Sequence, residues 1–125
     1  MDLPDLQGKK VVVTGAGAGI GRALCIRLHS QGLQVYALSK TLKNLESLLE
    51  ECPGISIIQQ DIADWKGTRS KIEALPSFDL LVNNAGLGDQ NLFVDVPEEE
   101  LDRYSCIVNR CSVSFFGRKM VRWRL

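Results

Sequence analysis

Four glycines between residues 14 and 21 form the part of this sequence best suited to binding chemistry. They lie in the segment Thr-Gly-Ala-Gly-Ala-Gly-Ile-Gly, after three consecutive valines and before apolar residues at helical spacing. A strand, a glycine turn and a helix start in that order present outward-pointing N–H groups and the positive end of a helix dipole. Glycine also lets a ligand approach the backbone closely. We therefore expect an anion site here, with the pyrophosphate of a dinucleotide as its ligand.

The spacing within this glycine turn (residues 14–21) is informative. The pattern G-x-G-x-x-G fails when it is counted from either Gly15 or Gly17. The pattern T-G-x-x-x-G-x-G fits Thr14, Gly15, Gly19 and Gly21. It resembles the cofactor turn of the short-chain dehydrogenase/reductases. A glycine-rich turn without a ligand is the alternative, and the flanking strand and helix disfavour it.

Strands and helices are predicted to alternate along the chain. Apolar runs predict strands at 10–14, 34–38, 55–58 and 78–82. Helices are expected at 20–31, from Thr41 as N-cap to the stop at Cys52-Pro53-Gly54, from Asp64 as N-cap to Leu75, and from about Pro97 to Gly117. Such βα units indicate an α/β fold, a partial Rossmann fold whose parallel sheet has the order 3-2-1-4 with flanking helices.

Helical spacing also predicts the buried face of each helix. We expect the buried residues to be Ile20, Ala23, Leu24 and Leu28 in the first helix; Leu42, Leu45, Leu48 and Leu49 in the second; Trp65, the stem of Arg69, Ile72 and Leu75 in the third; and Leu101, Tyr104, Val108, Cys111 and Phe115 in the fourth.

Three further segments carry the same family resemblance. Asn83-Asn84-Ala85-Gly86 follows the fourth predicted strand and matches the family's N-N-A-G signature. The resemblance implies that Asn83, Ala85 and Gly86 line the cofactor site. It also implies that Asp61-Ile62 contacts the adenine ring and that Asn109 is the catalytic asparagine of the fourth helix. Ile20, inside the glycine turn, is expected to contact the cofactor.

The residues after the second strand bear on the choice of nicotinamide cofactor. A site for NAD usually has an acidic residue about 20 positions after the glycine turn, bound to the ribose 2′-hydroxyl. The nearest acid here is Glu46, inside the next helix. Lys40 and Arg22 are candidates for pairing with a 2′-phosphate, so we expect NADP(H). A solvent-exposed helix residue is the alternative for Arg22, and Ala18 stands where NADP-binding relatives often have a basic residue.

The family comparison divides the chain into two parts. Residues 1–109 resemble the NADP-binding Rossmann half of the L-xylulose and carbonyl reductase branch, which reduces sugars and dicarbonyls. Residues 110–125 form a divergent basic tail with five basic residues and no acid. No residues of this sequence match the family's catalytic serine and its Tyr-x-x-x-Lys pair. The spacing of Tyr36 and Lys40 is right, but in a strand these two side chains lie ~13 Å apart.

We therefore expect a reductase that is catalytically incomplete as this chain and lacks the family's usual homo-oligomer interface. The alternative is a non-catalytic dinucleotide-binding or unstable truncated isoform. The formal net charge is zero, and neither a nucleic-acid partner nor a membrane span is expected. A basic aromatic segment at 118–125 that binds membrane or nucleic acid is a weaker reading. Four cysteines without a C-x-x-C pair and one histidine indicate reduced thiols, no metal site and a cytoplasmic protein.

Overall fold

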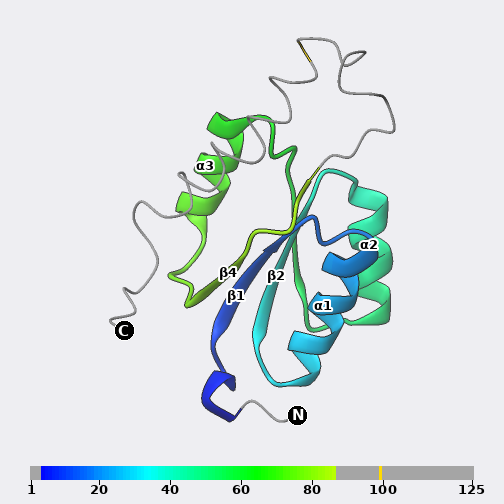
Figure 1. Ribbon diagram of the computed structural model, residues 1–125, viewed down its shortest axis with the longest axis vertical. Helices are drawn as coiled ribbons and strands as arrows, with labels where there is room; N and C mark the ends of the chain where they lie inside the picture. Colours follow the sequence, from blue (N-terminus) through cyan, green and yellow to red (C-terminus); the bar gives the residue numbers. More distant parts are fainter. Residues whose placement is uncertain (1–3, 87–98, 100–125) are drawn as a thin grey trace, which may run out of the picture.

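The computed structural model describes residues 4–86 and Glu99 (Figure 1). Apart from Glu99, which is helical, the predicted fourth helix lies outside these residues, as do Asn109 and the basic tail. The described elements are η1 (Pro4–Leu6), β1 (Lys10–Thr14), α1 (Gly19–Ser30), β2 (Gln34–Ser39), α2 (Leu42–Glu51), β3 (Ser56–Gln59), α3 (Trp65–Ala74) and β4 (Leu80–Val82). Among them, no helix has both the length and the apolar character to cross a membrane.

The four strands form one parallel sheet in the order β3-β2-β1-β4, which confirms the predicted fold. Val12 in β1 lies opposite Tyr36 in β2 on one side and opposite Leu81 in β4 on the other. Helices α1 and α2 cover one face of the sheet, and α3 lies on the opposite face (Figure 1). Because β1 is central, its loop is bordered by the loops that follow β2 and β4.

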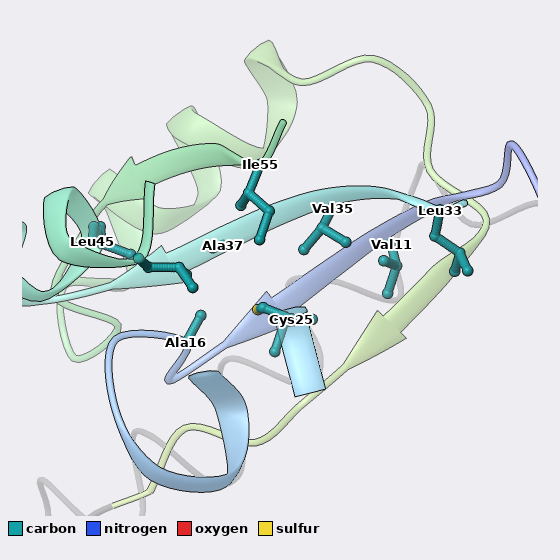
Figure 2. Packing of buried hydrophobic residues seen from close by; sticks show 10 residues of the cluster. Val11, Ala16, Cys25, Leu33, Val35, Ala37, Leu45 and Ile55 are labelled. Carbon is teal, nitrogen blue, oxygen red and sulfur yellow. The ribbon is translucent and has the colours of Figure 1, made fainter. Parts of the chain in front are cut away.

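The consecutive valines of β1 are buried on both faces of the sheet. Val11, Val12 and Val13 are each 0% exposed. Val11 and Val13 belong to one cluster with Cys25 of α1 and Leu45 of α2, in which Val11 lies beside Val35 (Figure 2). Val12 points to the other face, where it packs with Ile72 of α3 and residues near β4. Alternating side chains of a single strand therefore contribute to two hydrophobic clusters.

The predicted buried face of α1 is wrong in its first half, whereas Leu28 packs against the α1-side cluster as predicted. Ile20 is 79% exposed and Ala23 is exposed, whereas Gly21 and Cys25 are buried. The physical reason lies at Gly21, because a residue without a side chain lets the helix start pack directly against the preceding turn. The apolar pattern counted Ile20 as a core residue and could not register the buried glycine.

The predicted buried face of α2 is confirmed at its centre and wrong at its first residue. Leu45 and Leu48 are 0% exposed, as expected, but Leu42 is 40% exposed because it lies in the first turn, at the margin of the sheet. Thr41 occupies the N-cap position, yet its side chain makes no capping hydrogen bond. The predicted N-cap position is therefore confirmed, although the Thr41 hydroxyl does not supply the usual capping bond.

The third helix confirms its predicted cap and corrects its predicted face. The Asp64 carboxylate accepts a hydrogen bond from the Gly67 backbone N–H at 3.0 Å. Trp65 is 38% exposed, and Arg69 points to solvent, where it pairs with Glu73. The residue that joins Ile72 in the interior is Thr68, whose hydroxyl donates to the Asp64 carbonyl at 2.7 Å. That local bond lets a polar side chain replace an apolar one at a buried position.

Candidate functional site

The candidate site lies where four parallel strands end at the same edge of the sheet. Strands β1, β2, β3 and β4 end at Thr14, Ser39, Gln59 and Val82. The segments that follow them contain every predicted cofactor residue in the described part of the chain. In open α/β sheets, ligands bind outside the carboxyl ends of the strands, so the topology brings these segments to a suitable place.

Two glycines of the turn have backbone conformations that other residues rarely adopt. Gly15 has φ +65° and Gly19 has φ +57°. A Cβ added to Gly15 would lie 2.9 Å from the Ala85 Cα atom, so this glycine lets the turn approach the segment after β4. A Cβ added to Gly19 would meet no atom of the described residues within 4 Å. Gly19 therefore combines a conformational requirement with open space, as expected where a ligand approaches the backbone.

The other two glycines are required by close packing. A Cβ on Gly21 would collide with the Gly15 carbonyl oxygen. A Cβ on Gly17 would lie 2.6 Å from the Ser39 Oγ atom and 3.0 Å from the Asn44 Cβ atom. Gly17 thus fits the glycine turn against the end of β2 and the start of α2. Sequence analysis did not assign it to the site, although its position between two motif glycines was the available signal.

The first turn of α1 is open to a ligand. Ala18 is the N-cap residue, with extended backbone (φ −152°), and no side chain caps the helix there. The first turn also contains no acidic residue. Ile20, in that turn, is 79% exposed. Uncapped N–H groups and the positive end of the helix dipole make this turn a suitable site for a phosphate.

Thr14 joins the glycine turn to the segment after β4. It is 0% exposed, and its hydroxyl oxygen accepts hydrogen bonds from the backbone N–H groups of Asn84, at 3.1 Å, and Ala85, at 2.9 Å. The side-chain amide of Asn84 donates in return to the backbone carbonyls of Thr14, at 3.2 Å, and Gly15, at 3.3 Å. Thr14 therefore holds the glycine turn and the segment after β4 together.

The second asparagine of the N-N-A-G segment was missed as a site residue by sequence analysis. Asn84 is the residue whose side chain crosses to the glycine turn, whereas Asn83 is exposed and lies 3.5 Å from the Thr14 hydroxyl. Ala85 is half-buried and Gly86 is exposed. The available signal was an amide side chain in the loop after β4, because the backbone carbonyls of the neighbouring glycine turn need hydrogen-bond donors.

Lys40 and Asp61 lie together beyond β2 and β3. The Lys40 Nζ atom is 3.5 Å from an Asp61 carboxylate oxygen, and the two side chains are 62% and 40% exposed. The other Asp61 carboxylate oxygen accepts a hydrogen bond from the Ala63 backbone N–H at 3.0 Å. Ile62 is 7% exposed and belongs to the α3-side hydrophobic cluster. An exposed ion pair of this length contributes little, so Lys40 can exchange Asp61 for another anion at small cost.

Arg22 is bound to α2. Its guanidinium lies 2.6 Å from a Glu51 carboxylate oxygen and also donates to the Asn44 carbonyl and the Ser47 hydroxyl. Its side chain is 23% exposed. The structure thus brings Arg22 into a contact between two helices, which neither interpretation of the sequence described.

Cys25 lies inside the α1-side cluster and has a perturbed acidity. Burial, and to a smaller extent the nearby Cys52, together raise the pKa of the Cys25 thiol to about 11. The thiol therefore stays neutral near pH 7 and packs as a small apolar group.

Comparison with known proteins identifies the family. The family model described as short chain dehydrogenase matches residues 9–121. The chain belongs to this family. Its relatives include the D-erythrulose reductase of Gallus gallus, 46% identical over 102 residues, which are 80% of this chain and 42% of that protein. The L-xylulose reductase of Homo sapiens is 44% identical over 98 residues, 78% of this chain and 40% of that protein.

A solved structure agrees with this assignment. The L-sorbose reductase of Gluconobacter frateurii, in complex with NADPH and L-sorbose, superimposes with a TM-score of 0.74 at 25% identity. The match covers 87% of this chain and 45% of that one. This short-chain dehydrogenase chain thus spans about 40% of the length of the curated relatives, and it is an oxidoreductase family member similar to L-xylulose reductases.

Proposed function

We propose that this chain is the NADP(H)-binding part of a carbonyl reductase similar to L-xylulose reductase. Two facts support the cofactor and substrate class. The names of two relatives, D-erythrulose reductase and L-xylulose reductase, describe enzymes that reduce sugars. A structural neighbour holds NADPH together with the ketose L-sorbose.

The observation that carries the proposal is the open start of α1 beside an exposed lysine. The N–H groups at the start of α1 have no side-chain cap, and Gly19 leaves the approach to them free. Lys40 stands at the end of β2, where an NAD site would place an acid. A pyrophosphate fits the first feature and a ribose 2′-phosphate fits the second. The residues present therefore suit NADP(H).

Every predicted cofactor residue except Arg22 has a role in this proposal. Gly19, Ile20 and Gly21 hold the pyrophosphate through backbone N–H groups, and Lys40 pairs with the 2′-phosphate. Asp61 and Ile62 border the adenine. Asn83, Ala85 and Gly86 line the nicotinamide side, and Thr14 with Gly15 keeps that segment in place. Bound NADPH would supply the hydride for a carbonyl carbon. Asn109, proposed as a catalytic residue, lies outside the described residues.

A second function is that the chain binds the nucleotide without catalysing a reaction. The two functions share the binding site and differ in turnover. NADPH oxidation with diacetyl or L-xylulose above background would favour the reductase, and binding without turnover would favour the second function. In either case the free thiols of Cys25 and Cys52 suit the reducing conditions of the cytoplasm, where we place the protein.

The proposal is tested by reversing the charge at Lys40. Fluorescence titration of the Lys40→Asp variant should show NADPH affinity reduced by about 10- to 100-fold, because a charged hydrogen bond to the 2′-phosphate is lost. NADH affinity should be unchanged or improved. Lys9→Asp, at the opposite edge of the sheet just before β1, is the matched control and should change neither affinity. Equal affinities of the unaltered chain for NADPH and NADH would refute NADP(H) selectivity.

A further inference from the structure

Arg22 connects the two helices that border the proposed nucleotide site. We propose that Arg22 and Glu51, called here the α1–α2 clamp, position Lys40 for the nucleotide without themselves touching it. The proposal rests on the function proposed above and assigns to Arg22 a positioning role in place of direct contact with the 2′-phosphate.

The clamp reaches along most of α2. One guanidinium nitrogen of Arg22 lies 2.6 Å from the Glu51 carboxylate and 3.3 Å from the Ser47 hydroxyl. The other donates to the Asn44 backbone carbonyl at 3.2 Å. Asn44 is in the first turn of α2 and Glu51 is its last residue. One side chain of α1 therefore fixes both ends of the neighbouring helix.

Both ends of the clamp are continuous with the site. Arg22 comes three residues after Gly19, in the open turn of α1. Lys40 comes two residues before α2 begins at Leu42. Asn44 also packs against Gly17, whose added Cβ would lie 3.0 Å from the Asn44 Cβ atom. The clamp thus sets the distance between the part that would hold the pyrophosphate and the part that would hold the 2′-phosphate.

The contacts of Arg22 and Lys40 distinguish a residue that positions the site from a residue that binds the phosphate directly. The guanidinium of Arg22 has three acceptors on α2 and is largely covered, with 23% of the side chain exposed. A phosphate would have to displace the Glu51 carboxylate to reach it. Lys40 is 62% exposed and has a looser, 3.5 Å contact with Asp61. A phosphate can therefore recruit Lys40 more readily than Arg22.

The test compares the nucleotide affinities of two variants, for which direct phosphate binding by Arg22 and positioning by the clamp predict different results. Arg22→Met keeps the aliphatic stem, and Glu51→Gln keeps the shape of the carboxylate but removes its charge. If the clamp positions Lys40, each variant weakens NADPH by a factor of about three to ten and leaves NADH nearly unchanged, because only NADPH carries the 2′-phosphate that Lys40 would bind. If Arg22 instead binds the 2′-phosphate, Glu51→Gln frees it and tightens NADPH alone.

A matched control separates positioning from general stability. Arg69→Met breaks the exposed Arg69–Glu73 ion pair of α3, which also has a 2.9 Å contact, and should leave both affinities unchanged. Arg22→Lys should recover part of the affinity lost in Arg22→Met, because one contact to α2 can re-form. All titrations are made well below the melting temperature of each variant, so that unfolding does not imitate weak binding.

Three results would overturn the positioning role. They are tighter NADPH binding by Glu51→Gln, an equal loss of NADPH and NADH affinity in Arg22→Met, and unchanged affinities in both variants. A thermal double-mutant cycle on Arg22 and Glu51 tests the contact itself, and zero coupling would show that no clamp exists. If the unaltered chain binds neither nucleotide, the proposed function fails first, which is seen before any variant is examined.

Discussion

At the residue scale, the Thr14 hydroxyl joins the two central loops of the site. It accepts hydrogen bonds from the backbone N–H groups of Asn84 and Ala85 and is 0% exposed. Both residues follow β4, which ends at Val82, and the Asn84 N–H also donates to the Val82 carbonyl at 3.1 Å. The threonine oxygen therefore takes the place of a sheet partner for the segment that follows β4.

Replacing this hydroxyl should loosen the segment after β4. Thr14→Val has nearly the same shape but leaves the Ala85 N–H without its acceptor and the Asn84 N–H with only the Val82 carbonyl. We expect a loss of about 1–3 kcal/mol in the free energy of unfolding, measured by urea denaturation. Thr14→Ser keeps the oxygen and is the control; a larger loss in Thr14→Ser than in Thr14→Val would show that the methyl group matters more than the hydrogen bonds.

The Cys25 thiol should give the folded chain an alkaline limit. Its folded pKa is raised to about 11 from an ordinary value of 9.0 by burial. Below pH 9 the thiol is protonated in both states, so its contribution to stability is complete. As pH rises through the interval between these two pKa values, the unfolded state ionises first and stability falls, by about 3 kcal/mol overall.

The check is the pH dependence of unfolding between pH 8 and 11, compared with that of Cys25→Ala. The alanine variant should be less stable at pH 8, because it leaves space in the α1-side cluster, but its stability should fall less steeply with pH. Parallel curves for the two proteins would contradict the assignment of this slope to Cys25.

At the element scale, the start of α1 is set by glycines with opposite requirements. Gly21 has no room for a Cβ, which would meet the Gly15 carbonyl oxygen and the Asn84 amide. Gly19 has room but has φ +57°. The first requirement is one of packing and the second is one of backbone conformation, so alanine substitutions should separate them.

Gly21→Ala should therefore be much more damaging than Gly19→Ala. We expect Gly19→Ala to cost about 1–2 kcal/mol, the usual strain of a left-handed residue. Gly21→Ala should cost more, about 3 kcal/mol, because backbone atoms of the turn must move. Thermal melting with circular dichroism measures both, and comparable losses would contradict the packing role of Gly21.

The same elements show how far the sequence could predict this structure. The valines of β1, the turn residues and the βα alternation predict the sheet order, because strand burial and crossover handedness leave few topologies. The exposed Ile20 and Trp65 were predicted to be buried, since periodicity cannot detect a helix that packs through Gly21 or through the self-bonded Thr68. Contacts between distant residues, such as Arg22 with Glu51, leave no local pattern.

At the scale of the whole molecule, a parallel sheet with helices on both faces leaves one edge for binding. The α1 and α2 side and the α3 side have separate hydrophobic clusters, with β1 contributing to both. The loops at the carboxyl edge are joined by Thr14, Asn84, Lys40 and Asp61. A nucleotide bound there would contact loops from distant parts of the sequence, so binding should stabilise the chain as a whole.

The shift in thermal melting caused by nucleotides tests this account most directly. The full 125-residue chain is melted alone, with NADPH and with NADH, each nucleotide at the same concentration. We predict that NADPH raises the melting temperature more than NADH does, with about 2.7 kcal/mol of stabilisation once NADPH exceeds its dissociation constant about 100-fold. An equal or larger shift with NADH, or no shift with either nucleotide, would contradict the account.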